Sequence, residues 1–231
     1  MGPLALVGSG EYTPAMLEVE AGLIAGRPDR YVQIPAAASA EGEDRIRYWI
    51  ELGRAQAGRM GVKAVPLDVR SREDATDPAI VEQVPGAGLI YLSGGSPTLL
   101  ARILRDTPLW TAIVDAWENG AALAGCSAGA MVMAAQVPDL RHPRRGEAGL
   151  GLLPHIRVLP HFDRMLGWMP DILTRPFFRE ADIHVVGVDE DTALVGGPEE
   201  FTVQGRQSVW LLSDGRRRQF RSGEQVTLPR T

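Results

Sequence analysis

Short apolar runs alternate with helical patterns through the first half of the chain, and this alternation most limits the folds open to it. Stretches with apolar side chains at helical spacing separate the runs, at 43–60 and around 109–117. Such runs are typical of strands buried on both faces of a parallel sheet. They lie at residues 3–8, 30–35, 62–67, 87–94 and 121–125, each flanked by Gly or Pro. The pattern predicts an α/β fold with a mainly parallel sheet and helices on both faces.

The pattern changes after about residue 183, where short strand-like runs follow one another with turn residues and no room for helices. These runs span 183–188, 192–196, 200–205, 207–215 and 224–229. We expect strands and hairpins that finish the sheet or form a small antiparallel lobe. The basic runs at 141–145 and 215–221 are predicted to be solvated loops. Without an internal repeat or a flexible linker, residues 1–231 are expected to form a single domain.

Composition narrows the class of protein. The formal net charge of −5 argues against nucleic acid as a partner, because binding phosphates requires a dominant basic face. Cys126 is the one cysteine of the chain, which rules out an internal disulfide and fits a reducing compartment. The N-terminus lacks a basic region, and its apolar run is too short for a signal or membrane segment. We expect a cytoplasmic protein with no membrane partner; a homodimer is one assembly that the sequence leaves open.

Several familiar cofactor and metal motifs are absent or incomplete. "GSGEYT" at 8–13 begins like a dinucleotide-binding loop, but Thr13 occupies the place of the third glycine. The sequence has no Walker lysine, no HExxH and no CxxC motif, and its four histidines are not at metal-ligand spacing. We therefore expect no cofactor and no metal.

A cysteine and a serine stand side by side between two glycines, where a predicted strand gives way to a helical pattern. The segment Gly125–Gly129 matches G-x-S-x-G, the motif of a nucleophile elbow. Both flanking positions of an elbow must be small, because strand and helix pass closely there. Glycines occupy both flanks only when Ser127 is central. We therefore predict Ser127 as the nucleophile and Cys126 as a small buried side chain.

A serine hydroxyl also needs a base and donors for the oxyanion. The N–H of Ala128, first in the predicted helix, is one expected donor, and the Gly-Gly turn at 94–95 is expected to supply another. His161 directly follows the apolar run at 156–160, so a strand would deliver it to the same sheet edge. His161 is therefore the predicted base.

The remaining histidines fit the role of base less well. His155 and His184 flank predicted strands and are expected to be hydrogen-bonded structural groups, while His142 lies in a basic loop. The acid that orients the base should come from the turn between two apolar strands near residue 190. Glu190 is our prediction, although the residues alone leave open the three acids Asp189, Glu190 and Asp191.

Four segments along the chain together resemble a known family: "LVGSGEY", "YLSGGSPTLL", "GCSAGAM", and "PHFDR" paired with "VGVDEDTALV". They are similar to peptidase family S51, the dipeptidase E and cyanophycinase group of the class I glutamine amidotransferase-like superfamily. The resemblance implies a flavodoxin-like α/β sandwich, no cofactor, and substrates with an acidic residue, typically Asp, before the cleaved bond. It implies a site made of the nucleophile Ser127, the base His161, the third member Glu190, and the oxyanion donors Gly95 and Ala128.

The chain departs from dipeptidase E at two places. It has Ser96 and Pro97 where those relatives carry an Asn after the Gly-Gly turn, and Met131 where they have the Asn of "SAGAN". Arg164, three residues after His161, is predicted to bind the acidic side chain of the substrate, because a guanidinium matches a carboxylate with two hydrogen bonds. A structural ion pair is the other reading of Arg164. The loop at 141–149 is expected to add positive potential or to act as a lid.

The sequence thus predicts a serine peptidase that hydrolyses short peptides with an N-terminal acidic residue, of the Asp-X dipeptidase type. A small acidic peptide is the expected partner. One alternative is a cyanophycinase-like exopeptidase acting on Asp–Arg material. Another is an α/β-hydrolase-type esterase, in which Ser127 would be followed by Asp163 or Asp182 and then by His184. The third is a catalytically silent amidotransferase-like domain that binds a metabolite or a partner.

Overall fold

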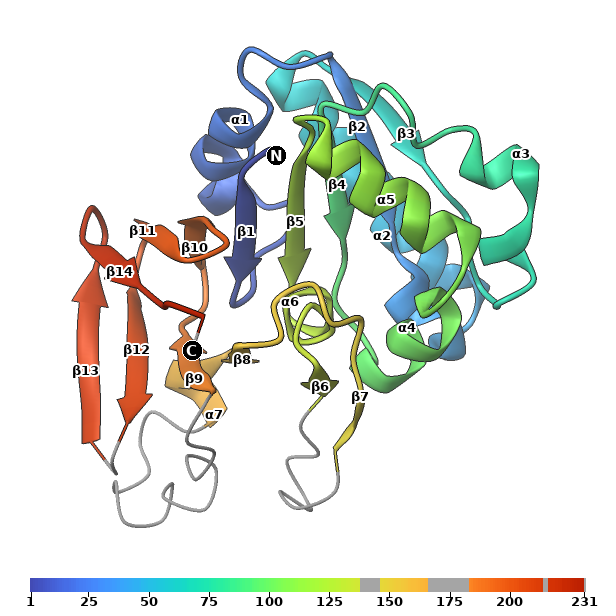
Figure 1. The fold of residues 1–231 in the computed structure, drawn as a ribbon. Coiled ribbons are helices and arrows are strands. Elements are labelled where there is room, and N and C mark those ends of the chain that lie inside the picture. Colours follow the sequence, from blue (N-terminus) through green and yellow to red (C-terminus); the bar gives the residue numbers. More distant parts are fainter. Residues whose placement is uncertain (138–145, 166–182, 214–215, 231) are drawn as a thin grey trace.

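An eight-stranded sheet forms the centre of the computed structural model, which describes residues 1–137, 146–165, 183–213 and 216–230 (Figure 1). The parallel part of this sheet contains β3 (Lys63–Pro66), β2 (Arg30–Ile34), β4 (Leu89–Leu92), β5 (Ala122–Cys126) and β1 (Leu4–Val7), in that spatial order. Each predicted apolar run is therefore a strand, with ends that differ by no more than two residues.

Antiparallel strands from the C-terminal part of the chain extend this sheet beyond β1. They are β10 (Thr192–Gly196), β11 (Glu200–Gly205) and β14 (Gln225–Thr227). β10 pairs directly with β1, so that Leu4 lies opposite Gly196 and Val7 opposite Ala193. β1 therefore lies inside the sheet, between β5 and a strand that comes almost two hundred residues later.

A second, four-stranded sheet lies beside the carboxyl ends of β1 and β5 (Figure 1). Its strands are β8 (Ile156–Leu159), β9 (His184–Val188), β12 (Ser208–Ser213) and β13 (Arg216–Arg221), in that order. β8 and β9 are parallel, and the remaining pairs are antiparallel. Both outcomes expected for the C-terminal strands thus occur, since some finish the main sheet and others form a separate sheet.

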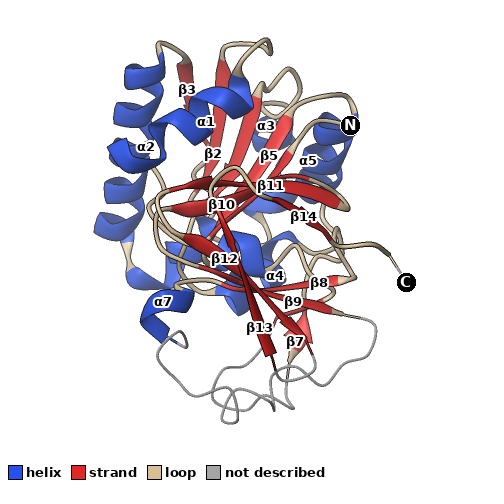
Figure 2. Ribbon diagram, turned by 90° about the vertical axis from the view of Figure 1, so that its left-hand side faces the viewer, coloured by secondary structure: helices blue, strands red, loops and turns tan. Residues whose placement is uncertain are grey.

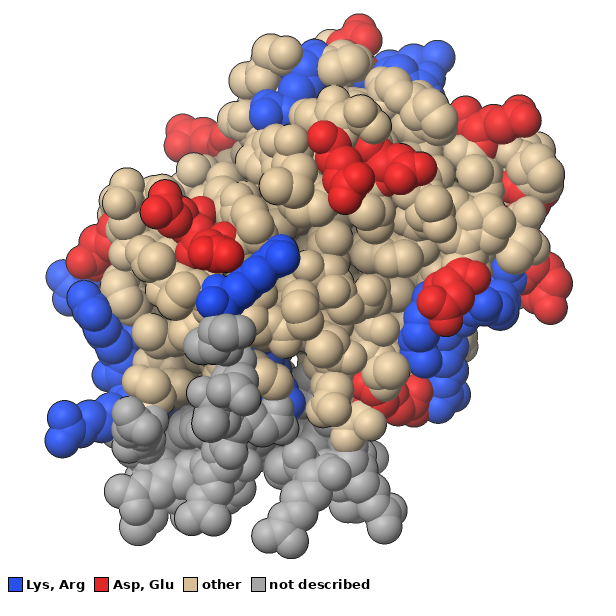
Figure 3. All heavy atoms as spheres, viewed as in Figure 1, with Lys and Arg blue, Asp and Glu red and all other residues tan. Residues whose placement is uncertain are grey.

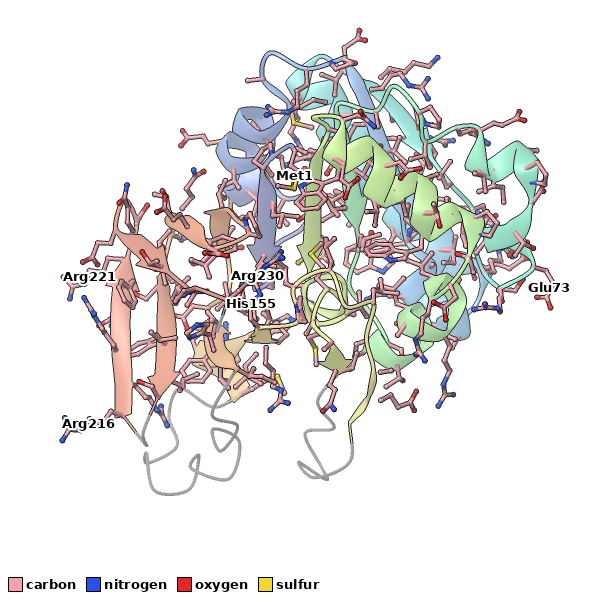
Figure 4. The ribbon with its side chains drawn as sticks, in the orientation of Figure 1. Met1, Glu73, His155, Arg216, Arg221 and Arg230 are labelled. Carbon is pink, nitrogen blue, oxygen red and sulfur yellow. The ribbon has the colours of Figure 1, made fainter. Side chains whose placement is uncertain are left out.

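The arginine-rich run at 215–221 was predicted to be a loop, and this prediction is wrong: residues 216–221 are strand β13. Phe220 is buried opposite Val209 and anchors the strand, while the Arg218 guanidinium lies 4.7 Å from the Phe220 ring centroid. Arg216 and Arg221 mark the two ends of this outermost strand in Figure 4, and basic side chains line the same edge of the molecule in Figure 3. A strand at the edge of a sheet has one edge without a partner strand. Charged side chains there discourage pairing with other chains.

Helices cover both faces of the main sheet, as predicted (Figure 2). α1 (Leu17–Ile24) and α2 (Glu43–Met60) pack on one face, whereas α3 (Pro78–Val81), α4 (Pro97–Leu104) and α5 (Pro108–Glu118) pack on the other. The two-residue period of a strand divides the core accordingly, because Ala5 and Val7 of β1 face α1 and α2 while Leu4 and Leu6 face the opposite side.

Short elements complete the connections. They are η1 (Pro14–Met16), η2 (Ala36–Glu41), η3 (Asp74–Thr76), α6 (Ala128–Met131), α7 (Phe162–Met165), β6 (Gln136–Val137) and β7 (Glu147–Ala148). β6 and β7 pair with each other at the base of the loop expected to act as a lid. Residues 141–145 of that loop, with His142, lie outside the described residues. That residues 1–231 form one domain stays a prediction.

Candidate active site

Ser127 stands alone between β5 and α6, at the turn predicted to be a nucleophile elbow. Its φ of 50° and ψ of −109° are unusual for a residue with a side chain, which is the strain expected at such a turn. A Cβ added to Gly125 would lie 2.3 Å from the Gly129 carbonyl oxygen, and one added to Gly129 would lie 2.1 Å from the Leu92 carbonyl oxygen. The close approach of strand and helix thus admits glycine alone on both flanks.

Cys126, the neighbour of Ser127, is fully buried under the turn. Its thiol donates a hydrogen bond to Glu11 Oε2 at 2.9 Å, a contact the sequence did not predict. Burial raises the pKa of Cys126 well above its ordinary value, and the nearby Glu11 carboxylate raises it further. Because the thiolate is the reactive form of cysteine, Cys126 is held in its unreactive form.

The side chains of Ser127, His161 and Glu190 form a continuous series of hydrogen bonds. His161 Nε2 lies 3.1 Å from Ser127 Oγ, and His161 Nδ1 lies 3.2 Å from Glu190 Oε1. His161 follows β8 by two residues and adopts a φ of 48°, while Glu190 lies in the turn between β9 and β10. Strand ends from both sheets therefore bring together the three residues predicted from the sequence.

The other two acids of the turn have different partners. Asp189 accepts hydrogen bonds from Trp210 Nε1 and from the Ser208 N–H, and burial raises the pKa of its carboxyl. Asp191 pairs with Arg206, whose Nη1 lies 3.3 Å from Asp191 Oδ2. Of the three acids left open by the sequence, Glu190 is the one in contact with His161.

Glu190 is held in place from several directions. Its N–H donates to Asp163 Oδ1 at 3.0 Å, and its carbonyl oxygen accepts from Gln207 Nε2 at 3.0 Å. Its second carboxylate oxygen accepts from Arg164 Nε at 3.3 Å. The Arg164 side chain is 74% exposed, so water screens this ion pair strongly. Arg164, predicted to bind substrate, therefore contacts the acid of the series.

The Gly-Gly turn after β4 is held by its flanking amides. The Ser93 N–H donates to the Ile34 carbonyl, the Gly94 N–H to Glu11 Oε1 and the Ser96 N–H to the Ala37 carbonyl. Within the described part of the chain, the N–H groups of Gly95 and Ala128 have no acceptor. A Cβ added to Gly94 would lie 3.4 Å from Ser127 Cβ, so the turn packs against the serine. These are the two amides that the sequence predicted as oxyanion donors.

His155 and His184 occupy structural positions, as predicted. His155 Nε2 lies 3.0 Å from the Pro198 carbonyl oxygen, and His184 Nε2 lies 2.9 Å from that of Pro229. The residues that an α/β-hydrolase triad would use do not come together in the described part of the chain, because His184 makes no described contact with Ser127. Of its candidate acids, Asp163 receives the Glu190 N–H, and Asp182 lies outside the described residues.

Sequence reasoning missed Glu11. It belongs to the "GSGEYT" segment, which resembles an incomplete dinucleotide loop, and an acid four residues after a buried strand was the available signal. At the two departures from dipeptidase E, Ser96 Oγ accepts from the Leu99 N–H at the start of α4, Pro97 is the first residue of that helix, and Met131 is buried. In the described part of the chain, no three His, Cys, Asp or Glu residues come together as metal ligands.

None of the helices in the described ranges is both long and apolar enough to cross a membrane.

Comparisons with curated proteins identify cyanophycinases as relatives. The cyanophycinase of Nostoc sp. (strain PCC 7120 / SAG 25.82 / UTEX 2576) is 30% identical over 205 residues, which cover 81% of this chain and 65% of the relative. The cyanophycinase of Synechococcus elongatus is 31% identical over 202 residues, covering 81% and 60% respectively. The chain thus spans less than two thirds of the length of these relatives.

Two solved structures of other proteins are also similar to this chain. A crystal structure of a peptidase from an acI-B1 Actinobacterium matches with a TM-score of 0.89 and 42% identity, covering 98% of this chain and 97% of the other. A putative Peptidase E protein from Listeria monocytogenes EGD-e matches with a TM-score of 0.65 over 90% of this chain and 100% of the other; at 17% identity it shows a likeness of fold alone. The model of peptidase family S51 matches residues 4–203. The chain therefore belongs to peptidase family S51.

Proposed function

We propose that the protein is a serine peptidase that hydrolyses short peptides carrying an acidic residue on the N-terminal side of the cleaved bond. The observation that carries this proposal is the series Ser127–His161–Glu190, with 3.1 Å and 3.2 Å between successive side chains. Structural ion pairs are common on protein surfaces, but they do not normally end on a serine held in strained backbone geometry. Family membership supports the same chemistry.

The reaction begins with attack of Ser127 Oγ on the carbonyl carbon of the substrate. As the new C–O bond forms, the hydroxyl proton passes to His161 Nε2. Collapse of the tetrahedral intermediate breaks the C–N bond, and His161 returns the proton to the leaving amine. A water molecule, deprotonated by His161, then hydrolyses the acyl-enzyme and regenerates the Ser127 hydroxyl.

Glu190 and the backbone amides assist this chemistry without forming covalent bonds. Glu190 accepts the Nδ1–H of His161, which keeps the Nε2 lone pair directed at the serine and stabilises the imidazolium that forms. The N–H groups of Gly95 and Ala128, which have no acceptor among the described residues, stabilise the oxyanion of the tetrahedral intermediate. Removing one such donor in serine peptidases lowers kcat by about 10²–10³-fold.

Arg164 supplies the preference for an acidic side chain. A guanidinium has five N–H donors, and the pair with Glu190 uses the one on Nε. The Nη groups then bind a substrate carboxylate in the bidentate geometry that arginine favours. Because Arg164 lies next to the acid of the series, the recognised side chain would lie beside the cleaved bond.

Arg206 provides a control that separates this role from a structural one. It is exposed, like Arg164, and it pairs with Asp191 in the same turn. We expect Arg164→Ala to raise KM for Asp-Leu about tenfold or more, the loss of one charged contact, while leaving turnover of Leu-Leu unchanged. Arg206→Ala should change neither. An equal fall in kcat for both dipeptides in Arg164→Ala would make Arg164 a support for Glu190 instead.

A second candidate is a cyanophycinase-like exopeptidase that acts on Asp–Arg material. The similarity to cyanophycinases at 30–31% identity is the observation that favours it. The two candidates share the nucleophile and differ in the size of the substrate. Activity on a branched Asp–Arg polymer, compared with activity on Asp-Leu, distinguishes them.

The decisive assay compares Asp-Leu with Leu-Leu and Lys-Leu, together with trapping by a serine-directed phosphonate and peptide mapping. We expect cleavage of Asp-Leu above both other dipeptides, and a label on Ser127 but not on Cys126. Cleavage of Leu-Leu as fast as Asp-Leu would refute the acidic preference and leave the peptidase chemistry standing. A wild-type protein that neither cleaves peptides nor takes the label would refute the peptidase itself and favour the silent binding domain.

A further inference from the structure

We propose that Glu11 is a positioning residue for this site: its buried carboxylate fixes the Gly94–Gly95 turn and Cys126 beneath Ser127, and thereby aims the oxyanion donor. The inference rests on the proposed peptidase function and extends it to a residue that touches neither substrate nor the hydrogen-bonded series. Glu11 is 7% exposed and lies four residues after the end of β1.

One carboxylate links the ends of three adjacent strands. Glu11 comes from the segment after β1, Cys126 is the last residue of β5, and Gly94 follows β4. Oε2 accepts the Cys126 thiol proton at 2.9 Å, and Oε1 accepts the Gly94 N–H at 2.9 Å. Ser127 directly follows Cys126, so both strand ends that form the elbow and the oxyanion turn are held by the same side chain.

The hydrogen bond from the Gly94 N–H to Glu11 matters for the neighbouring Gly95 N–H. In the turn from Ser93 to Ser96, the N–H groups of Ser93, Gly94 and Ser96 all have acceptors. Among the described residues, the Gly95 N–H is the one amide of this turn with no acceptor. Fixing the peptides on both sides of Gly95 sets the direction of its N–H. Without Glu11 the Gly94 amide would be buried without a partner, and the turn could rotate to satisfy it.

A second bond ties the same segment to the same turn. The Tyr12 hydroxyl lies 2.7 Å from Ser93 Oγ, and Tyr12 adopts a φ of 62°. The segment after β1 therefore holds the turn through Glu11 at Gly94 and through Tyr12 at Ser93. A carboxylate accepts hydrogen bonds and does not donate them, so Glu11 cannot bind the oxyanion itself. It acts through the groups that it holds.

Glu20 is a matched control for a purely structural role. It is also buried, at 1% exposure, and accepts hydrogen bonds from the Tyr31 hydroxyl and the Tyr12 N–H. No described contact joins Glu20 directly to the Gly94–Gly95 turn, and Glu20→Gln keeps a side-chain oxygen that can accept the Tyr12 N–H. If burial of a satisfied carboxylate were all that mattered, replacing either acid would have the same effect on catalysis.

The test measures kcat, KM and melting temperature with Asp-Leu for Glu11→Ala, Glu11→Gln and Glu20→Gln. Misplacement of catalytic groups by about 1 Å costs about 10²-fold, so Glu11→Ala should lower kcat by about that factor while KM changes little. Glu11→Gln retains an oxygen acceptor for the Gly94 N–H and should restore kcat to within about tenfold of the wild type. Glu20→Gln should leave kcat unchanged. A wild-type kcat in Glu11→Ala, or an equal loss in Glu20→Gln, overturns the inference.

Amide exchange at Gly94 separates failure of this inference from failure of the proposed function. We expect the Gly94 N–H to exchange slowly in the wild type, much faster in Glu11→Ala, and at the wild-type rate in Glu20→Gln. This readout needs no substrate, so it applies even to a protein that cleaves no peptide. If Glu11→Ala does not fold, Glu11→Asp replaces it, since the shorter side chain withdraws the acceptor. Unchanged exchange in the folded variant overturns the inference.

Discussion

Glu20 makes the stability of this protein depend on pH in a direction opposite to that of most carboxylates. Burial raises its pKa from 4.5 to about 7, although hydrogen bonds from Tyr31 and Tyr12 partly offset the effect. Well below pH 4.5 the folded and unfolded states both hold the proton, and folding carries no charge penalty. As the pH rises, the unfolded state releases its proton first, so the free energy of unfolding falls until the folded state also ionises, at about pH 7.

The size of the effect follows from the displacement of the pKa. A change from 4.5 to about 7 corresponds to about 3 kcal/mol in total. Of this, about 2.5 kcal/mol is lost between about pH 5 and about pH 8. Glu20→Gln imitates the protonated carboxyl and cannot ionise, so it should lack this loss. Relative to the wild type, the variant should therefore gain about 2.5 kcal/mol of stability over that interval.

Urea unfolding followed by tryptophan fluorescence, at about pH 5 and about pH 8, measures this difference. Glu18→Gln is the control for the same substitution at an exposed position of the same helix. The reasoning is refuted if Glu20→Gln and the wild type differ by a constant amount across the interval. It is also refuted if the variant loses stability relative to the wild type as the pH rises.

Three further predictions concern the elbow and the acid. Ser127→Ala should abolish turnover of Asp-Leu, whereas Cys126→Ala should keep most of it at a lower melting temperature; the reverse result would make Cys126 the nucleophile. Glu190→Gln should lower kcat by about 10²–10⁴-fold through lost orientation of the imidazole, and a larger loss in His184→Ala would reassign the base. Gly125→Ala should fail to fold or lose at least about 3 kcal/mol of stability, because its Cβ would lie 2.3 Å from a backbone oxygen; a wild-type melting temperature would contradict this.

The parts of the fold that could be predicted from the sequence are those that depend on residues close together in the chain. A strand buried on both faces is apolar along its length, so the runs at 3–8 and 87–94 identified β1 and β4. The elbow was predictable because α6 approaches β5 and β4 too closely for side chains at Gly125 and Gly129. Helix α2 begins and ends at the predicted residues 43 and 60, and a left-handed Gly61 with a φ of 70° terminates it.

The remaining features depend on partners far away in the sequence. Glu11 looks like any acid in a surface loop, and its burial follows from Gly94 and Cys126, which are 83 and 115 residues away. Strand β13 has the composition of a basic loop because Phe220 is the one buried residue among 216–221. In the same way, the three acids near residue 190 could not be ranked without the contacts of Trp210 and Arg206 to the two that do not reach His161.

The position of β1 inside the main sheet has a consequence for synthesis on the ribosome. β1 can pair with β5 once residue 126 has emerged, but its other edge waits for β10, which ends at Gly196. During that interval the nascent chain presents an unpaired edge with the apolar sequence Leu-Ala-Leu-Val, a template for association with other chains. Glu190 lies two residues before β10, so we expect it to reach His161 as this edge is closed. While this edge stays open, the proposed Ser127–His161–Glu190 series is therefore also incomplete.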